Sequence, residues 1–490
     1  MREIALIALP MAGALAALAW PRDDSRRWLL PVVGVGHAAL AIWMLLAPPP
    51  VTDGGWLGFD ALTRAILPAV SLLFLACSAY GVSYLKIRAE RSNRVFLASL
   101  LALMGLISLS LQARHLGLLW IAVEGATLAT VPLLHFNGTA RAFEATWKYL
   151  LVGGTGVAFS LLGSFFLGYA SLHGGGGGDL TFSALAKSGA TLSRPWVISA
   201  WVFLLAGYGT KMGLAPMHTW KPDAYGEAPG IVGALLAGGM TTVAFVALLR
   251  VKQVVETAGM GNMASLTLMT LGLFSMLVAA LFLLGTPDFK RMLAYSSVEH
   301  MGILSVGAAL GSAGVLAALF HVWNNSLTKG ALFLSAGNLR RASGGRTVSE
   351  VAGLAWLTPA SARIFVTGLF AVTACPPFGP FFSELGIVRA ALANGKGGTV
   401  AMFLGCLLLA FLGMSRLVFA IVDGRPRNAD RENAARKTAL LTSCPTGGET
   451  VGVILPPLAL LVVSLWLGLA TPPILREVWA NAVQMLSSTP

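Results

Sequence analysis

Ionisable side chains lie inside apolar stretches of this sequence, where a charge is costly. Glu124 lies within LLWIAVEGATLATVPLL, Lys211 within FLLAGYGTKMGLAPMHTW, and Glu384 within CPPFGPFFSELGIV. His321 and Lys329 share the stretch HVWNNSLTKGALFL. A charge in the middle of a membrane costs at least about 2.5–3.5 kcal/mol and is usually retained for an ion pathway or a proton relay. We therefore expect these residues to carry chemistry.

The residue types in this set fit a proton relay. Carboxylates, amines and an imidazole on different helices can exchange protons when the proton affinity of each group depends on the charge of its neighbours. The alternative is a set of static ion pairs that hold helices together, and residues near helix ends, such as Arg64 and Lys148, can also extend to the membrane surface. We favour the relay because acids, lysines and a histidine occur together. Candidates for a secondary part in it are Lys148, Glu144, His218, Thr242, Glu299 and His300.

Two of the apolar stretches contain proline close to the charge. Pro216 follows Lys211, and Pro376 and Pro377 precede Glu384. Proline removes a backbone donor and kinks a helix, and backbone groups freed at membrane depth must line a cavity or find polar partners. A kink that serves only packing is common in a single helix. Two charged, broken helices in separate halves of a chain indicate an inverted-repeat transport fold.

The composition identifies the elements that must hold these residues. Hydrophobic residues make up 56% of the 490 residues and charged residues 11%, whereas an average soluble domain is about one-quarter charged. The chain must therefore expose apolar side chains to lipid, and a membrane helix needs about 20 such residues. We predict an all-α membrane protein of about 14 transmembrane helices, with two inverted five-helix repeats and broken helices. The predicted segments are 3–20, 28–48, 58–84, 94–112, 115–136, 144–170, 197–218, 228–250, 263–285, 291–311, 313–335, 361–390, 399–422 and 451–470.

These predicted helices fall into four regions. Residues 1–90 form an N-terminal three-helix segment, and 91–255 form the first repeat, helices 4–8. Residues 256–425 form the second repeat, helices 9–13, and 426–490 form a cytoplasmic loop and the C-terminal helix. No loop is long enough to bury a core of its own, so we predict no soluble domain.

Basic residues in the loops predict the orientation. They are roughly twice as frequent in odd-numbered loops as in even-numbered ones, which places the odd loops in the cytoplasm. This count treats Lys221, Lys290 and Arg291 as loop residues. An even number of helices then puts both termini on the periplasmic side of a bacterial inner membrane.

Composition and motifs argue against several functions. The net charge is +13, but its basic residues read as topology determinants and no basic-aromatic patch suggests nucleic acid. The four cysteines form no CxxC pair, which gives no support to iron–sulfur, zinc or haem sites. There is no P-loop and no GxGxxG motif after a strand. We expect no cofactor and no metal in this chain.

Five motifs together carry a resemblance to a known family. VEGATLATVPLL, KMGLAPMHTWKPDAYGEAP, DFKRMLAYSSVEHMG, HVWNNSLTKGALFLSAGNL and PPFGPFFSEL resemble the antiporter-like membrane subunits of respiratory complex I and its relatives. Within that family, YSSVEHMG and NSLTKGALFLSAGNL look closest to the F-type subunit of group 4 membrane-bound nickel–iron hydrogenases, the hydrogenase-4 kind. The resemblance implies a fourteen-helix fold and a proton path through a hydrophilic axis at mid-membrane.

The resemblance also implies roles for single residues. Glu124 matches the helix-5 glutamate that pairs with the broken-helix lysine, here Lys211. Lys329 with His321 matches the central relay position of the second half, and Glu384 matches the terminal charge of its broken helix. Glu299 and His300 match a polar pair of the hydrogenase-type branch, for which packing at the cytoplasmic side is the alternative.

The sequence departs from the family at two positions. Many members have a lysine in helix 8 where this chain has Thr242, and hydrogenase-type sequences usually have a histidine where it has Asn325. The path from Lys211 to Lys329 is then expected to run through water and hydroxyl groups.

Three functions follow as hypotheses. The first is a proton-conducting subunit of a hydrogenase or complex I-like complex, with other membrane subunits and soluble nickel–iron or iron–sulfur subunits as partners. The second is a proton-coupled subunit of a non-redox uptake or cation/proton antiporter complex, for inorganic carbon or sodium. The third is a structural scaffold, in which neutralising the buried charges leaves function intact.

Overall fold

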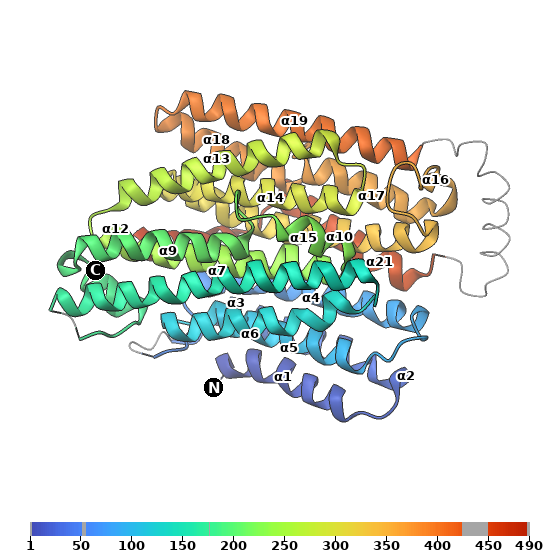
Figure 1. The fold of residues 1–490 in the computed structure, drawn as a ribbon, viewed down its shortest axis with the longest axis horizontal. Coiled ribbons are helices and arrows are strands. Elements are labelled where there is room, and N and C mark those ends of the chain that lie inside the picture. Colours follow the sequence, from blue (N-terminus) through green and yellow to red (C-terminus); the bar gives the residue numbers. More distant parts are fainter. Residues whose placement is uncertain (1, 51–54, 176, 424–448, 488–490) are drawn as a thin grey trace.

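Long helices run side by side along the longest axis of the molecule, with α1 and α19 at opposite edges of the array (Figure 1). The computed structural model describes residues 2–50, 55–175, 177–423 and 449–487. Within these ranges the chain is helical, and its only extended pairings are isolated bridges such as Leu57 with Ala113. The predicted all-α class is therefore confirmed, and most of the predicted loop before residue 450 lies outside the described residues.

The helices have the following bounds: α1 Arg2–Ala19, α2 Asp23–Arg26, α3 Leu29–Leu46, α4 Ala61–Ile87, α5 Arg94–Gln112, α6 Leu116–His135, α7 Ala140–His173, α8 Phe182–Lys187, η1 Gly189–Thr191, α9 Arg194–Met212, α10 Trp220–Glu227, α11 Gly230–Leu235, η2 Leu236–Met240, α12 Thr241–Thr257, α13 Gly261–Gly285, α14 Phe289–Ala308, α15 Gly311–Ser343, α16 Leu354–Leu357, α17 Pro359–Val372, α18 Gly379–Ala393, α19 Gly397–Val422, α21 Val451–Leu469 and α22 Pro473–Ser487.

Ten helices of the described chain are long and apolar enough to cross a membrane. Several helices of the described chain begin at a side chain that accepts hydrogen bonds from the first turn, as helix N-termini require. Asp60 accepts from the backbone N–H of Thr63 at 2.8 Å before α4, and Asp288 accepts from that of Lys290 at 2.8 Å before α14. These caps give the first backbone N–H groups an acceptor and so fix the residue at which each helix starts.

The first interruption follows Lys211. Helix α9 ends at Met212, and Gly213 adopts a left-handed conformation with φ 80°. Glycine is favoured there because it has no Cβ to clash. Pro216 lies in the segment between α9 and the short helix α10. The helix-end carbonyl groups have partners: the Trp220 indole donates to Thr210 O at 2.9 Å and the Lys221 ammonium donates to Met212 O at 2.8 Å.

The second interruption precedes Glu384. The predicted continuous segment 361–390 is two helices, α17 and α18, separated by residues that include Pro376 and Pro377. The backbone passes very close to its neighbours at this point. A Cβ on Gly379 would lie 1.9 Å from Asn324 Oδ1, and a Cβ on Gly468 would lie 2.2 Å from Pro377 O. Only glycine fits at these two positions.

A third irregularity lies in the helix that carries Thr242. The segment η2 is a π-helical turn between α11 and α12. A π turn frees carbonyl groups from their usual partners, and α15 uses two of them. Asn325 donates to Ala237 O at 3.3 Å and Ser326 donates to Gly238 O at 2.7 Å.

Two sequence expectations need correction. Lys221 and Lys290 were counted as loop residues, but their exposed fractions are 0% and 1%. The Lys290 ammonium donates to the carbonyl groups of Gly226 and Ala228, at the end of α10. The second correction concerns the C-terminus, where α22 follows α21. Its outer face is polar, with Arg476 among its residues, so an apolar-run criterion misses it.

Candidate functional site

Lys211 lies inside the first half of the molecule. Its exposed fraction is 1%, and its ammonium donates to the Thr127 hydroxyl at 2.6 Å. The ammonium also lies 5.1 Å from the centre of the Tyr149 ring, a cation–π contact. Gly153 leaves room for it, because a Cβ there would lie 2.9 Å from Lys211 Nζ.

Glu124 lies on α6, one turn before Thr127. It is half-buried, and no hydrogen-bond partner within the described chain reaches its Oε2. The family resemblance implied a direct pair between Glu124 and Lys211. In the structure, Lys211 bonds to Thr127 instead. The two charges still act on each other electrostatically. The arrangement leaves the Glu124–Lys211 contact open, which a switchable pair requires.

Lys221 is a buried lysine that sequence reasoning missed. It lies on α10, with its ammonium bonded to Met212 O, 3.4 Å from Ser297 O of α14, and 5.7 Å from the Tyr225 ring centre. In the sequence it stands in the polar stretch HTWKPDAYGE, which resembles a loop. The available signal was its place directly after the proline-broken end of α9, where freed carbonyl groups require donors.

Lys329 lies at the centre of the second half. Its ammonium donates to the Ser296 hydroxyl of α14 at 2.6 Å, and its exposed fraction is 0%. Glu299, one turn further along α14, is buried and acts on Lys329 electrostatically. Lys221 and Lys329 thus contact consecutive residues of α14, Ser297 and Ser296. This helix joins the buried lysines of the two halves.

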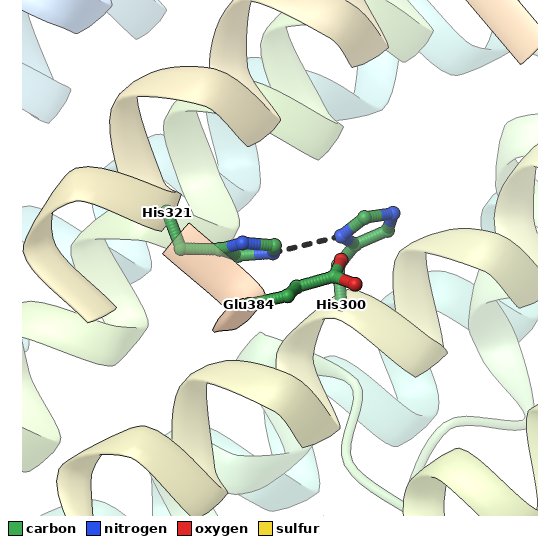
Figure 2. Close-up of side chains that lie close together, drawn as sticks. All are labelled: His300, His321 and Glu384. Carbon is green, nitrogen blue, oxygen red and sulfur yellow. Dashed lines mark hydrogen bonds between the residues drawn. The ribbon is translucent and has the colours of Figure 1, made fainter. Parts of the chain in front are cut away.

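His300 and His321 form a direct pair. Figure 2 shows their rings pointing at each other, with His300 Nδ1 2.9 Å from His321 Nε2. On its other side, His321 Nδ1 is 2.9 Å from Ser383 Oγ. The Ser383 hydroxyl donates its own proton to Pro380 O at 2.8 Å, so its oxygen accepts from His321 Nδ1–H. His321 Nε2 is then the acceptor, and His300 Nδ1–H is the donor.

Glu384 completes this group from α18. Its exposed fraction is 4%, and neither carboxyl oxygen has a hydrogen-bond partner in the described chain. His300 Nε2 likewise has none. The three side chains come from three different helices and gather in one place (Figure 2). Buried polar atoms without partners mark places where a proton, a water molecule or an ion can bind.

Lys148 and Glu144 do not belong to this buried set. The Lys148 side chain is 48% exposed and pairs with Glu144 at 2.7 Å and with Asp223 at 2.9 Å. Arg291 pairs with the other oxygen of Asp223 at 2.5 Å. These residues line a polar surface cavity of about 360 Å³. Lys148 lies in the first turns of α7 and is exposed, in agreement with the alternative that a residue near a helix end extends to the surface.

Thr242 and His218, two other residues predicted to take a secondary part in the relay, lie inside the molecule. The Thr242 hydroxyl donates to Gly238 O of the preceding π-helical turn at 2.8 Å, which commits its proton and leaves its oxygen as an acceptor. His218 lies in the segment after α9, buried beside the rings of Phe282 and Tyr295, and its Nδ1 has no partner in the described chain.

Sequence comparison identifies the family. Residues 113–442 match the family described as NADH:quinone oxidoreductase/Mrp antiporter, TM. The chain belongs to this family. It is 36% identical over 441 residues to the hydrogenase-4 component F homolog of Methylacidiphilum infernorum, covering 87% of this chain and 91% of that one. It is 33% identical over 451 residues to NADH-quinone oxidoreductase subunit N of Desulforudis audaxviator, covering 87% and 88%.

Solved structures share the fold of this family member. A chain of the Mrp complex from Dietzia sp. DQ12-45-1b aligns with a TM-score of 0.84 at 22% identity, covering 99% of this chain and 98% of that one. A chain of respiratory complex I from Thermus thermophilus aligns with a TM-score of 0.77 at 22% identity, covering 97% and 98%. The predicted membership among antiporter-like membrane subunits is confirmed.

Proposed function

We propose that this chain is the proton-conducting membrane subunit of a complex I-like or membrane-bound hydrogenase complex. One observation carries the proposal: on α14, the Ser296 hydroxyl accepts from Lys329 and the backbone carbonyl of the next residue, Ser297, accepts from Lys221, so one helix contacts buried lysines from the two halves of the molecule. A proton that reaches Lys211 then has ionisable neighbours on both sides of the centre. The relatives at 36%, 33% and 31% identity are named as parts of hydrogenase or quinone-reducing complexes, which favours this function over a non-redox uptake or antiporter complex.

In this proposal the buried residues act in sequence. Glu124 modulates the proton affinity of Lys211, and Lys211 holds the entering proton. Lys221 carries it across the junction to Lys329, which shares it with the pair His300–His321. Glu384 releases it on the far side. Electron transfer takes place in partner subunits, and this chain binds no cofactor of its own.

The proposal includes a fourteen-helix topology. Four further spans, α9, α14, α15 and the pair α17–α18, bring the ten apolar spans to fourteen. These four fail the apolar criterion because they are shorter or carry the buried polar residues. The interruptions after Lys211 and before Glu384 support two inverted repeats, at 91–255 and 256–425, after the N-terminal segment 1–90 and before 426–490. Both termini then face the periplasm of a bacterial inner membrane. Other membrane subunits of the complex cover its flanks.

Proton flux in proteoliposomes tests the proposal. Replacing Glu124 by Gln or Lys211 by Ala should abolish flux through the purified full-length chain, measured with a pH-sensitive dye, while yield and thermal stability stay normal. The matched controls Glu90→Gln and Lys187→Ala change exposed charges and should leave flux unchanged. Unchanged flux in both buried variants would contradict the relay and favour the scaffold.

A further inference from the structure

The group of His300, His321 and Glu384 has a property that a proton relay does not require. One ligand atom from each side chain can be chosen so that all three atoms lie within 4.8 Å of one another. All three side chains are buried. Both carboxyl oxygens of Glu384 have no hydrogen-bond partner within the described chain. Such atoms in so small a space offer lone pairs to a cation.

We propose that His300, His321 and Glu384 form a binding site for a divalent transition-metal ion of the Zn²⁺ type. Two imidazoles and a carboxylate are a zinc donor set, with the fourth position open to water. Hard cations such as Na⁺, Mg²⁺ and Ca²⁺ prefer oxygen ligands and do not suit two ring nitrogens. The sequence contains no sign of a metal, because these ligands come from separate helices and form no spacing motif.

The distances are close to those that zinc requires. Zn–N and Zn–O bonds of about 2.0–2.2 Å place two ligand atoms of a tetrahedral site roughly 3.3–3.5 Å apart. The facing nitrogens of His300 and His321 are 2.9 Å apart and share the proton on His300 Nδ1. Metal binding must therefore move this proton to Nε2 of the same ring and separate the two nitrogens by about 0.4 Å. The other separations, at most 4.8 Å, must close by at most about 1.5 Å, which side-chain torsions can supply.

Ser383 positions one of the ligands. Its oxygen accepts from His321 Nδ1–H, which leaves the lone pair of Nε2 directed at the site. Metal-binding histidines commonly have such a partner on the other ring nitrogen, and its loss typically weakens binding 10–100-fold. Ser383 itself does not reach the metal position, because its hydroxyl is committed to Pro380 O.

The charges around the site allow a divalent ion. Glu384 is a ligand, and Glu299 lies near enough to interact with it electrostatically. Lys329 also acts on both histidines and opposes the ion. Lys221 also acts on His300, so two carboxylates face two ammonium groups and the surroundings carry no net charge before the ion binds. Bound metal would fasten α18 to α14 and α15 and fill the place through which a proton passes. This consequence rests on the proposed function, whereas the metal site itself does not.

Metal binding is tested on the purified full-length chain after treatment with a chelator. Equilibrium dialysis against buffered Zn²⁺, followed by elemental analysis, should find one zinc per chain, and X-ray absorption should show Zn–N/O bonds of about 2.0–2.2 Å with imidazole scattering. His300→Gln, His321→Gln and Glu384→Gln should each remove this zinc, and Ser383→Ala should weaken it 10–100-fold. His173→Gln, which changes an exposed histidine, is the control. Absence of zinc, or equal zinc in every variant, would overturn the proposal.

Proton flux provides a separate readout. Zinc should slow flux through the unmodified chain in proteoliposomes, EDTA should restore it, and Ser383→Ala should need 10–100 times more zinc for the same inhibition. If one zinc binds at this site and flux is unchanged, the metal site stands and the proposed proton path is refuted. If zinc inhibits flux equally in Ser383→Ala, inhibition occurs elsewhere and the proposed site is not responsible.

Discussion

Lys221 offers a sharp test of how protons cross between the two halves. Lys221→Met keeps an unbranched side chain, one heavy atom shorter, and removes its charge. The proposed path then has no ionisable group between Lys211 and Lys329 at this point. An uncompensated charge at mid-membrane costs at least about 2.5–3.5 kcal/mol, and 1.36 kcal/mol corresponds to a tenfold change in rate. We therefore expect proton flux to fall by a factor of about 70–400.

Stability must be separated from conduction in this variant. Lys221→Met leaves Met212 O and Ser297 O without the Lys221 donor. An unsatisfied buried polar group lowers the free energy of unfolding by about 1–3 kcal/mol. Lys290→Met is a matched control, because Lys290 is equally buried and also donates to two carbonyl groups, at the end of α10. Both variants should lose similar thermal stability, and only Lys221→Met should lose flux.

The assay is dye-reported proton flux into proteoliposomes with an imposed membrane potential, normalised to the amount of folded chain. Flux within twofold of the unmodified chain in Lys221→Met would refute the crossing through Lys221. An equal loss of flux in Lys290→Met would also refute it, because the loss would then follow from removed backbone partners and not from the missing charge.

Three further variants test the surrounding structure. Thr242→Val should leave proton flux within about twofold, since its hydroxyl serves only its own helix; a large loss in the same assay would restore Thr242 to the path. Gly379→Ala should lower the melting temperature, because a Cβ would lie 1.9 Å from Asn324 Oδ1 and overpacking costs about 1–3 kcal/mol, whereas Gly398→Ala, with open space around it, should not. Asp60→Leu should destabilise the fold by about 3–5 kcal/mol by leaving Arg250 buried and unpaired, and adding Arg250→Met should recover most of the loss in a thermal melt.

Composition and periodicity predicted the buried residues well, because burial of a charge inside an apolar run leaves a local signal. Lys211, His321, Lys329 and Glu384 all lie inside the molecule. Lys148 looked the same in sequence but is exposed, since an apolar run near a helix start does not reveal which face points outward. The reverse error concerns Lys221, whose polar neighbours resemble a loop although the chain folds back into the core.

The contacts between these residues could not be predicted in the same way. Lys211 bonds to Thr127 on another helix, and this choice depends on rotamers that sequence spacing does not determine. His300, His321 and Glu384 meet because three helices converge, and helix packing is a tertiary property. The motif YSSVEHMG indicated that α14 carries function. It gave no sign that Ser296 and Ser297 face different lysines.

The burial of the relay within one chain has a consequence for its function. Lys211, Lys221 and Lys329 are each at most 1% exposed in the chain alone, so helices of this subunit separate the centre of the path from lipid and bulk water without help from a partner. A gradient alone should then drive protons through the isolated subunit. Pumping against a gradient needs a source of energy, which the proposed function assigns to the partner subunits. Reconstituted alone, the chain should therefore conduct protons only downhill, and uphill transport should appear only when its partner subunits are added.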